Sequence, residues 1–438
     1  MSIFSQLKQQ LSEQLAKQVS LQGLIEIQAS VCVSDENVAF LAGLNAQKNI
    51  YPHFFLKNRD RDQTVITLGA VKTFQQLETA QAFIQQTGFP LIGGLQFEGE
   101  CCFVLPRLKL VKEQQNLTAY FYLDLSTETS QAVNFDDYFT TFEAQQNDLA
   151  PLSNNSFAHK PLANRLIERK TACDFEGWQT NINKAINEIQ ARNFSKVVLA
   201  NAICLTFEKP ISAYELLEQS QKINLGCYHF LWAENSETVF VGSTPERLYL
   251  RQARNLYTEA LAGTVAVTED LAQTEQNAQW LLNDTKNVYE NQLVVDDITR
   301  HLEDCVEQIE IGKAEIKRLH NVQHLRRKIQ AVLKPTISDS ECLIRIHPTA
   351  AVAGLPRAKA KQFIAEDEPF TRGWYAGTLG ILGEDEAEFC VTLRSAQIKQ
   401  NQVTLYAGAG IVQDSEPLSE WQEIERKSQA LAKLLSYT

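Results

Sequence analysis

Short strand-like runs, separated by brief polar turns, crowd the second half of the sequence. Turns such as Ala233–Glu237 and Gly383–Ala387 are short enough to join neighbouring runs into antiparallel hairpins. The expected strands are Tyr228–Trp232, Thr238–Val241, Arg247–Leu250, Cys342–Ile346, Trp374–Leu382, Glu388–Gln397 and Gln402–Ala407. Expected helices cover Asp174–Ala191, 275–308, about 314–333, 356–366 and 417–435. Strands, then helices, then strands again favour an α+β fold.

A polar, asparagine-rich stretch at residues 144–165 predicts a long connection between two regions. Before it, residues 1–150 form an N-terminal α+β region that we expect to be integrated with the core. It begins with an amphipathic helix whose apolar positions are Phe4, Leu7, Leu11 and Leu15. It also holds strand-like pieces at Val65–Leu68 and Cys102–Leu105. After the connection, residues 166–438 form the expected catalytic region, with an apolar strand at Lys196–Phe207.

The balance of charge excludes some classes of partner. The net charge is −12, from 41 basic and 53 acidic residues, which argues against broad binding to nucleic acid or anionic membranes. No eighteen apolar residues run together, so no membrane span is expected. The nine cysteines are odd in number and scattered, without a C-x-x-C pair, so neither a disulfide framework nor structural zinc is indicated. A reducing cytoplasm is the expected compartment.

Two helices carry carboxylates that could share a task. Glu290 and Lys286 are four residues apart in the expected helix 275–308, and Glu423 and Lys427 repeat this spacing in the last helix. The ordinary interpretation of each is a surface ion pair, which contributes a few tenths of a kcal/mol. Carboxylates on separate helices are also what Mg²⁺ needs, because it takes one or two protein carboxylates together with substrate and water oxygens.

Lys196 and Glu246 stand at unusual places for charged side chains. Lys196 heads an apolar strand, where it could simply extend from the strand end to solvent. Glu246 follows a proline on a turn between two apolar strands, where exposure is the ordinary interpretation. Gly408 and Gly410 interrupt the end of another strand and would allow a ligand to approach the backbone closely.

Taken together, nine short motifs follow one another in a single order across about 230 residues. They are KVVLA (196–200), GSTPERL (242–248), TEALAGT (258–264), K-x₃-E-x₃-VV (286–295), HPTAAVAGLP (347–356), RGWYAG (372–377), LRSA (393–396), AGAGIV (407–412) and EWQEIERK (420–427). This series resembles the chorismate-utilising enzymes. Within that family, TEALAGT and FVLPRLKL (103–110) most resemble the isochorismate synthases of the menaquinone pathway.

The resemblance implies a fold of two large antiparallel sheets flanked by helices, with the site in a cleft between them. It implies an isomerase that adds water at C2 of chorismate and expels the C4 hydroxyl, for menaquinone or siderophore synthesis. Lys196 matches the family's general base and Glu246 its general acid, while Glu290 and Glu423 match the Mg²⁺ ligands. The implied substrate-binding residues are Thr264, His347, Tyr375, Arg394, Gly408, Gly410 and Lys427. A monomer or a homodimer is expected.

Other members of the family remain alternatives. Aminodeoxychorismate synthases commonly place a nucleophilic lysine in a PIKGT motif, where this chain has Ala262, so covalent catalysis of that kind is disfavoured. Salicylate synthase, which eliminates pyruvate after making isochorismate, is the nearest rival. An ammonia-using anthranilate synthase component is a second. An inactive binding paralogue is a third, and the presence of all four catalytic and metal residues argues against it. Departures from the family pattern at Asn201, Ala350 and Ala353 affect loop geometry.

Overall fold

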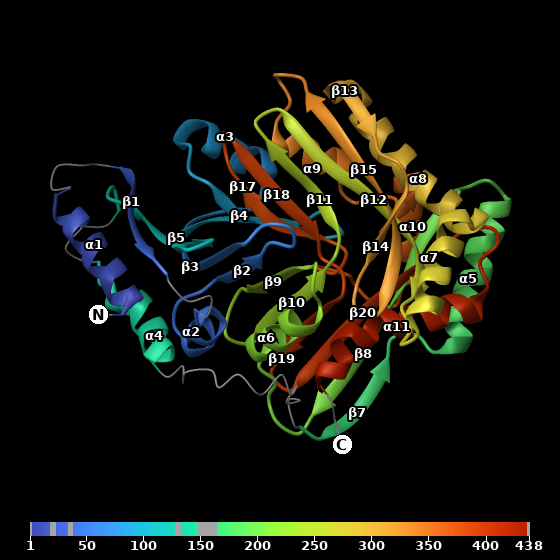
Figure 1. Cartoon of the computed structure of the whole chain (residues 1–438), viewed down its shortest axis with the longest axis horizontal. Helices are drawn as coiled ribbons and strands as arrows, with labels where there is room; N and C mark the ends of the chain where they lie inside the picture. Colours follow the sequence, from blue (N-terminus) through green and yellow to red (C-terminus); the bar gives the residue numbers. More distant parts are fainter. Residues whose placement is uncertain (1, 18–22, 34–37, 128–132, 148–163, 436–438) are drawn as a thin grey trace.

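The computed structural model describes residues 2–17, 23–33, 38–127, 133–147 and 164–435 (Figure 1). Its N-terminal elements are α1 (Ile3–Lys17), β1 (Leu24–Cys32), α2 (Phe40–Ala46), β2 (His53–Lys57), β3 (Gln63–Phe74), α3 (Leu77–Thr87), β4 (Leu91–Leu95), β5 (Cys101–Glu113), β6 (Asn116–Asp124) and α4 (Asp136–Asn147). The expected connection at 144–165 lies mostly outside the described residues, although α4 reaches into it.

The remaining described elements are runs of strands interrupted by helices. They are β7 (Leu166–Thr171), α5 (Phe175–Gln190), β8 (Lys196–Phe207), α6 (Ala213–Ile223), β9 (Tyr228–Ala233), β10 (Thr238–Thr244), β11 (Arg247–Gln252), β12 (Asn255–Ala266), α7 (Leu271–Asn283), α8 (Thr285–Leu302), β13 (Val306–Ile311), β14 (Glu315–Arg318), β15 (Val322–Leu333), α9 (Asp339–Ile346), β16 (Gly354–Leu355), α10 (Arg357–Asp367), β17 (Thr378–Leu382), β18 (Glu386–Val391), β19 (Ser395–Lys399), β20 (Gln402–Ile411) and α11 (Pro417–Ala432). Short 3₁₀ turns follow α8 and α11.

Within the described residues, all strands belong to one hydrogen-bonded antiparallel sheet that divides into two arms. The pair β3–β5 joins the arms. The first arm runs from β3 through β2, β9, β10, β19 and β20 to β8. The second arm runs from β5 through β4, β17, β18, β11 and β12 to β15. The two sheets expected from the sequence are therefore present, and they are continuous through β3 and β5.

Strand pairing crosses the expected boundary near residue 150. Strand β2 of the N-terminal region pairs with β9, and β4 pairs with β17 along five residue pairs from Thr378↔Leu95 to Leu382↔Leu91. Because these strands share backbone hydrogen bonds, the N-terminal region forms part of both arms. The location of the boundary itself stays a prediction.

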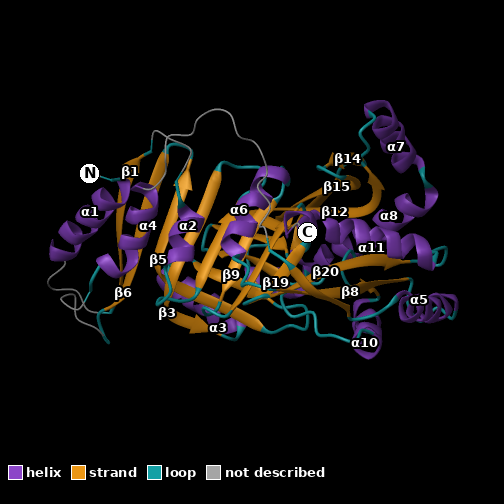
Figure 2. Cartoon of the chain, turned by 90° about the horizontal axis from the view of Figure 1, so that it is seen from below, coloured by secondary structure: helices purple, strands orange, loops and turns teal. Residues whose placement is uncertain are grey.

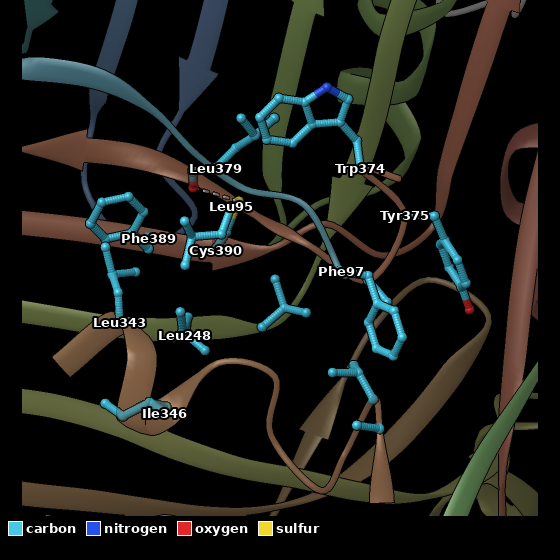
Figure 3. Close-up of a cluster of buried hydrophobic side chains, with 14 of the residues drawn as sticks. Leu95, Phe97, Leu248, Leu343, Ile346, Trp374, Tyr375, Leu379, Phe389 and Cys390 are labelled. Carbon is cyan, nitrogen blue, oxygen red and sulfur yellow. Dashed lines mark hydrogen bonds between the residues drawn. The ribbon is translucent and has the colours of Figure 1, made fainter. Parts of the chain in front are cut away.

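Two hydrophobic cores hold the arms in place. The first fills the space between the arms, where Leu95, Leu248, Leu343 and Phe389 pack together from strands and from α9 (Figure 3). The second lies outside the first arm and is covered by α1, α2, α4 and α6, seen along one face of the strands in Figure 2. The predicted apolar face of α1 is confirmed, since Phe4, Leu7, Leu11 and Leu15 are all buried in this second core.

Two expected elements are wrong in type. The helix expected at about 314–333 is instead the strand pair β14 and β15, because pairing of β15 with β12, β13 and β14 overrides the weak strand propensity of its Lys, Arg and Gln residues. The strand expected at Cys342–Ile346 is the second half of helix α9. Ser338 caps that helix by accepting a hydrogen bond from the backbone N–H of Glu341, a pairing that the S-x-x-E spacing signals.

Other expected elements are correct in type but too long. The helix at 275–308 is two helices, α7 and α8, because Asp284 ends one and caps the other. The strand at Trp374–Leu382 begins only at Thr378, and the strand at Glu388–Gln397 is broken between Val391 and Ser395. Both losses place irregular backbone beside the cleft described below. None of the described helices is long and apolar enough to cross a membrane.

Candidate active site

A cleft opens between the ends of the two arms, with about 780 Å³ of empty space if the part open to solvent is counted. Strands β8 and β20 form one wall, β12 and β15 form another, and α8 and α11 contribute side chains. Nine of the residues singled out in the sequence line the cleft: Glu246, Thr264, Glu290, Tyr375, Arg394, Gly408, Gly410, Glu423 and Lys427.

Lys196 contacts Glu290, and Glu290 lines the cleft. As the first residue of β8 it is held in the pairing with Leu355 of β16, and its side chain is fully buried. Its Nζ lies 2.9 Å from Oε1 of Glu290, which projects from α8. Burial alone would raise the pKa of Glu290, but the charge and hydrogen bond of Lys196 outweigh it and hold that pKa below its ordinary value. The lysine and the carboxylate therefore form a charged pair at the edge of the cleft.

Gly410 provides the space for this pair. A Cβ atom at Gly410 would lie 2.3 Å from Oε1 of Glu290 and 2.9 Å from Cε of Lys196. Gly408 likewise has no room for a side chain, since a Cβ there would lie 2.9 Å from the hydroxyl of Tyr375. Both glycines belong to β20, and β19 pairs with that strand only as far as Leu405. Beyond Leu405, the edge of β20 that β19 no longer covers therefore lies open beside the cleft. There Lys427 donates a hydrogen bond to the carbonyl of Gly408 at 2.9 Å.

Glu246 lies on the turn between β10 and β11 and is buried. Burial raises the pKa of its carboxyl group to about 8, and the nearby Glu259 carboxylate adds to the rise. The turn is fixed through its backbone, because the carbonyl of Glu246 accepts a hydrogen bond from the N–H of Val391 at 3.1 Å. At neutral pH Glu246 therefore holds a proton that it can donate into the cleft.

A chain of hydrogen bonds joins Arg394, His324 and Thr264 across the cleft wall. Nη2 of Arg394 donates to Nε2 of His324 at 2.6 Å, and Nδ1 of His324 lies 3.0 Å from the hydroxyl of Thr264. Burial and the charges of Arg394 and Lys427 lower the pKa of His324 well below its ordinary value, so the ring is neutral. Because Nε2 accepts, the ring proton lies on Nδ1, whose partners are the hydroxyl of Thr264 and the backbone of Gly263.

Backbone strain is concentrated in the same cleft. Ala376 and Arg394, both of which line it, have left-handed backbone conformations with φ of 57° and 48°. Ala376 lies where one expected strand begins late, and Arg394 lies where the other is broken. Residues other than glycine in this conformation cost about 1 kcal/mol or more and tend to gather at functional sites.

The carboxylates of α8 and α11 face the same part of the cleft. Glu290 pairs with Lys196, and Glu423 pairs with Lys427 at 2.7 Å. A third carboxylate, Glu420, is buried behind them and accepts a hydrogen bond from Lys286 at 2.8 Å. In the described part of the chain, no three His, Cys, Asp or Glu side chains are grouped closely enough to hold a metal alone. Two carboxylates that leave the remaining positions to substrate and water fit the donor chemistry of Mg²⁺.

Two candidate residues are absent from the lining of the cleft: Lys196, which contacts the lining residue Glu290, and His347, which lies elsewhere. His347 is buried at the end of α9, where its backbone N–H donates to the carbonyl of Leu343, and it does not line the cleft. The histidine at the cleft is His324. Sequence reasoning missed it because β15 was expected to be a helix. It also missed the buried state of Glu420, for which the helical spacing of Glu420 and Glu423 was the available signal.

Comparisons with known proteins agree with the motif pattern. A family model described as chorismate binding enzyme matches residues 96–436. The chain is 45% identical to the isochorismate synthase MenF of Haemophilus influenzae over 92% of its own length and 90% of that protein's. It is 40% identical to MenF of Escherichia coli over 89% of each chain. A solved structure of the menaquinone-specific isochorismate synthase MenF from Escherichia coli superposes with a TM-score of 0.85, 38% identity and coverage of 98% of this chain and 100% of that one.

Proposed function

Because the chain belongs to the chorismate-binding enzyme family, we propose that it is an isochorismate synthase, an isomerase that serves menaquinone synthesis. The observation that carries this proposal is that one cleft has a protonated carboxyl group, Glu246, in its lining and a buried lysine, Lys196, directly behind the lining residue Glu290. The long match to relatives named isochorismate synthase supports it.

The reaction needs one proton removed and one supplied. Lys196 takes a proton from the water that attacks C2 of chorismate, and Glu246 gives its proton to the C4 hydroxyl, which leaves as water while the double bonds shift. The entering and departing groups balance, so the product is an isomer of the substrate. Burial suits Glu246, because it favours the protonated form that a general acid needs. In this scheme Lys196 acts after its proton has been lost from the pair with Glu290.

The substrate's carboxylates would be held by groups that already line the cleft. Arg394 is fixed by His324 and turned inward, Lys427 lies at the open edge of β20, and the hydroxyls of Thr264 and Tyr375 can donate. Gly408 and Gly410 leave the backbone of β20 accessible. We do not assign His347 a contact with the substrate, because it lies away from the cleft.

Glu290 and Glu423 would hold Mg²⁺, with Lys196 and Lys427 as their present partners. When bound there, Mg²⁺ supplies charge that neutralises the substrate's carboxylates and orients the ring. A cytoplasmic location is part of the proposal, supported by nine cysteines that are all free. Either a monomer or a homodimer is compatible with this scheme, since every residue used comes from one chain.

The alternative members of the family differ from an isochorismate synthase in the nucleophile that they use and in how far the reaction proceeds. The cleft wall at Ala262 offers no amine, which disfavours covalent catalysis through that position. The test is to incubate purified protein with chorismate and Mg²⁺ and to separate the products. Isochorismate as the main product supports the proposal. Salicylate with pyruvate would show that catalysis continues, and anthranilate on addition of ammonia would show a different nucleophile.

A further inference from the structure

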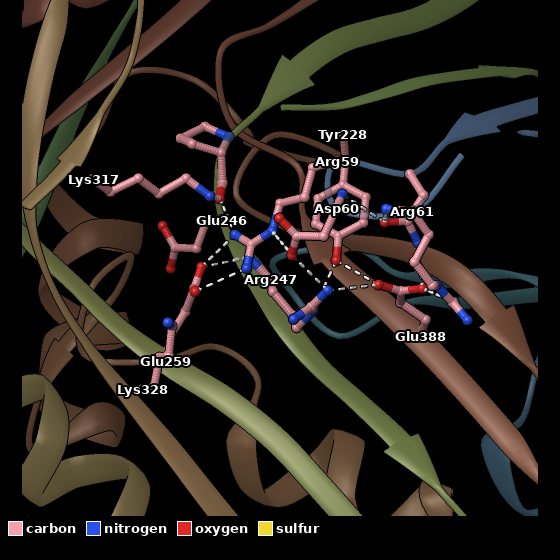
Figure 4. Close-up of polar contacts among 12 residues, drawn as sticks. Arg59, Asp60, Arg61, Tyr228, Glu246, Arg247, Glu259, Lys317, Lys328 and Glu388 are labelled. Atoms are coloured by element: carbon pink, nitrogen blue, oxygen red, sulfur yellow. Dashed lines mark hydrogen bonds and ion pairs between the residues drawn. The ribbon is translucent and has the colours of Figure 1, made fainter. Parts of the chain in front are cut away.

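One arginine of the N-terminal region reaches the catalytic end of the molecule. Arg59 lies in the tight turn between β2 and β3, and its side chain is only 1% exposed. It contributes nothing to the lining of the cleft. Figure 4 shows it directed toward Glu259 and toward the turn that carries Glu246. An arginine buried so completely must have partners for its charge and its donors.

One of those partners immediately precedes Glu246 in the sequence, and the other is the carboxylate of Glu259. The guanidinium of Arg59 donates to the carbonyl of Pro245 and to both oxygens of Glu259, with Nη2 2.8 Å from Oε2. Lys317 of β14 donates to the same Pro245 carbonyl at 3.1 Å. The carbonyl immediately before Glu246 is therefore held by two cations from separate parts of the chain.

Glu259 holds the other side of the turn. Its Oε1 accepts a hydrogen bond from the backbone N–H of Arg247 at 3.2 Å, and its side chain is 3% exposed. Burial alone would raise the pKa of Glu259, but the charge and hydrogen bonds of Arg59 outweigh it, so this carboxyl group is ionised. Arg59 and Glu259 together thus hold the peptide groups on either side of Glu246.

The same network contributes to the electrostatic potential at the carboxyl group of Glu246. The groups that act on Glu246 are Glu259 from β12, Lys196 from β8, Lys427 from α11 and Arg59 from the β2–β3 turn, and Glu246 in turn acts on Tyr375 and Arg394. Glu259 favours the protonated form of Glu246, whereas Arg59, Lys196 and Lys427 favour the ionised form. The two members of the buried pair therefore act on the acid in opposite directions.

We propose that Arg59 and Glu259 are positioning residues for Glu246. The N-terminal region then contributes to catalysis through Arg59, which fixes the turn that carries Glu246 from outside the cleft. The inference rests on the proposed function, since it assigns Glu246 the role of general acid. Arg59 and Glu259 touch neither the cleft nor the substrate site. Their effect is expected in the rate of the chemical step and in its pH dependence, with little change in substrate affinity.

The experiment compares Arg59→Gln, Glu259→Gln and Arg59→Lys with the full-length wild-type chain. Arg61→Gln is the matched control, because Arg61 lies in the same turn and pairs with Glu386 and Glu388 instead of Glu259. For each variant, kcat and KM for chorismate are measured from pH 6 to 10 with saturating Mg²⁺. We expect kcat of Arg59→Gln and Glu259→Gln to fall about tenfold or more, a fraction of what a general acid contributes, with KM changed less than about threefold.

The pH profiles carry the sharper test. The fall of kcat/KM at high pH, which reports loss of the Glu246 proton, should move to lower pH in Glu259→Gln, because the carboxylate that raises the pKa of Glu246 is removed while Arg59 keeps its charge. Arg59→Lys should keep the wild-type midpoint and recover part of kcat, and Arg61→Gln should match the wild type in both. An unchanged midpoint in Glu259→Gln, a shift of its midpoint to higher pH, or a loss of affinity in place of rate would overturn the inference.

Lys317→Met tests the proposal even if the Arg59 or Glu259 variants fail to fold. This change removes the second donor to the Pro245 carbonyl and leaves the Arg59–Glu259 pair intact. We expect kcat to fall about threefold or more, with an unchanged circular dichroism spectrum and KM. A wild-type rate in this folded variant would count against the proposal. If the wild-type chain itself made no isochorismate, the proposed function would fail instead, so the two failures are distinct.

Discussion

The ammonium nitrogen of Lys196 lies 2.9 Å from the carboxylate of Glu290, so the residue proposed as the base neutralises the residue proposed as a metal ligand. The two roles therefore compete for one carboxylate. While the pair is intact, Glu290 has one fewer lone pair for a cation.

Lys196→Met should strengthen binding of Mg²⁺ to the substrate-free protein by about tenfold, or ~1.4 kcal/mol, because Glu290 is freed from its partner. Isothermal titration calorimetry with Mg²⁺ measures this directly, and Glu290→Gln should remove the gain. Lys184→Met, which breaks an ion pair with Asp367 outside the cleft, serves as the control. Equal or weaker binding in Lys196→Met would show that Glu290 is not a ligand.

Glu246→Gln should lower kcat by about 10²–10⁴-fold, the range that general acid catalysis contributes, while circular dichroism stays unchanged. In the wild type, kcat/KM should fall as the pH rises through about 8, where Glu246 loses its proton. A rate close to that of the wild type in Glu246→Gln would disprove its role. The same profile should lack this high-pH fall in any residual activity of the variant.

The raised pKa of Glu246 also makes the folding stability of the chain depend on pH. The unfolded chain ionises this carboxyl group above about 4.5, whereas the folded chain keeps its proton until about 8. The unfolded state therefore binds fewer protons across that window, and stability falls as the pH rises from 4.5 through 8. Glu246→Gln should have a higher Tm than the wild type at pH 8 and a similar Tm at pH 4.5. A difference that is constant with pH would contradict this.

Asn291 should be essential for the shape of the β12 wall. Its Nδ2 donates to the carbonyls of Ala260, Ala262 and Leu325 at 3.1–3.3 Å, at the bulge where β12 and β15 slip out of register between Leu261 and Thr264. Asn291→Asp would place a carboxylate against three carbonyls and should destabilise the fold by about 3 kcal/mol, measured by urea denaturation. Asn283→Asp on the exposed face of α7 is the control, and an equal effect there would refute the argument.

Gly410→Ala should reduce kcat by about 100-fold or more, because its Cβ would lie 2.3 Å from Oε1 of Glu290 and 2.9 Å from Cε of Lys196, so both side chains would have to move. Steady-state kinetics with chorismate and Mg²⁺ titrations report the two consequences separately. Gly312→Ala, where the nearest atom would lie 3.2 Å away, should be close to wild type. An active Gly410→Ala would mean that the Lys196–Glu290 contact is dispensable.

Sequence patterns were most informative where a side chain's role depends on its own neighbours in the chain. The buried face of α1 and the strand beginning at Lys196 follow from local periodicity and composition, and the structure confirms both. The motif series correctly indicated the family, and nine of its candidate residues meet in one cleft. Their individual roles remain proposals.

The residues that sequence reasoning missed depend on contacts distant in the chain. His324 was hidden because the composition of β15 suggests a helix, and only pairing with β12 makes it a strand. Arg59 lies in a run of charged residues that is typical of an exposed turn, yet its partner Glu259 is 200 positions away. Nothing local distinguishes such an arginine from a solvated one.

The continuity of the sheet across β2 and β9 makes the length of the β2–β3 hairpin as important as its composition. Pairing of His53–Lys57 with β9 and with β3 sets where the turn begins, and Arg59 is two residues beyond that pairing. An inserted or deleted residue within 53–57 would reverse the faces of β2 and carry the guanidinium away from Glu259. Over evolution, substitutions in this hairpin can be absorbed one by one, whereas insertions and deletions there should be as rare as changes in the cleft itself.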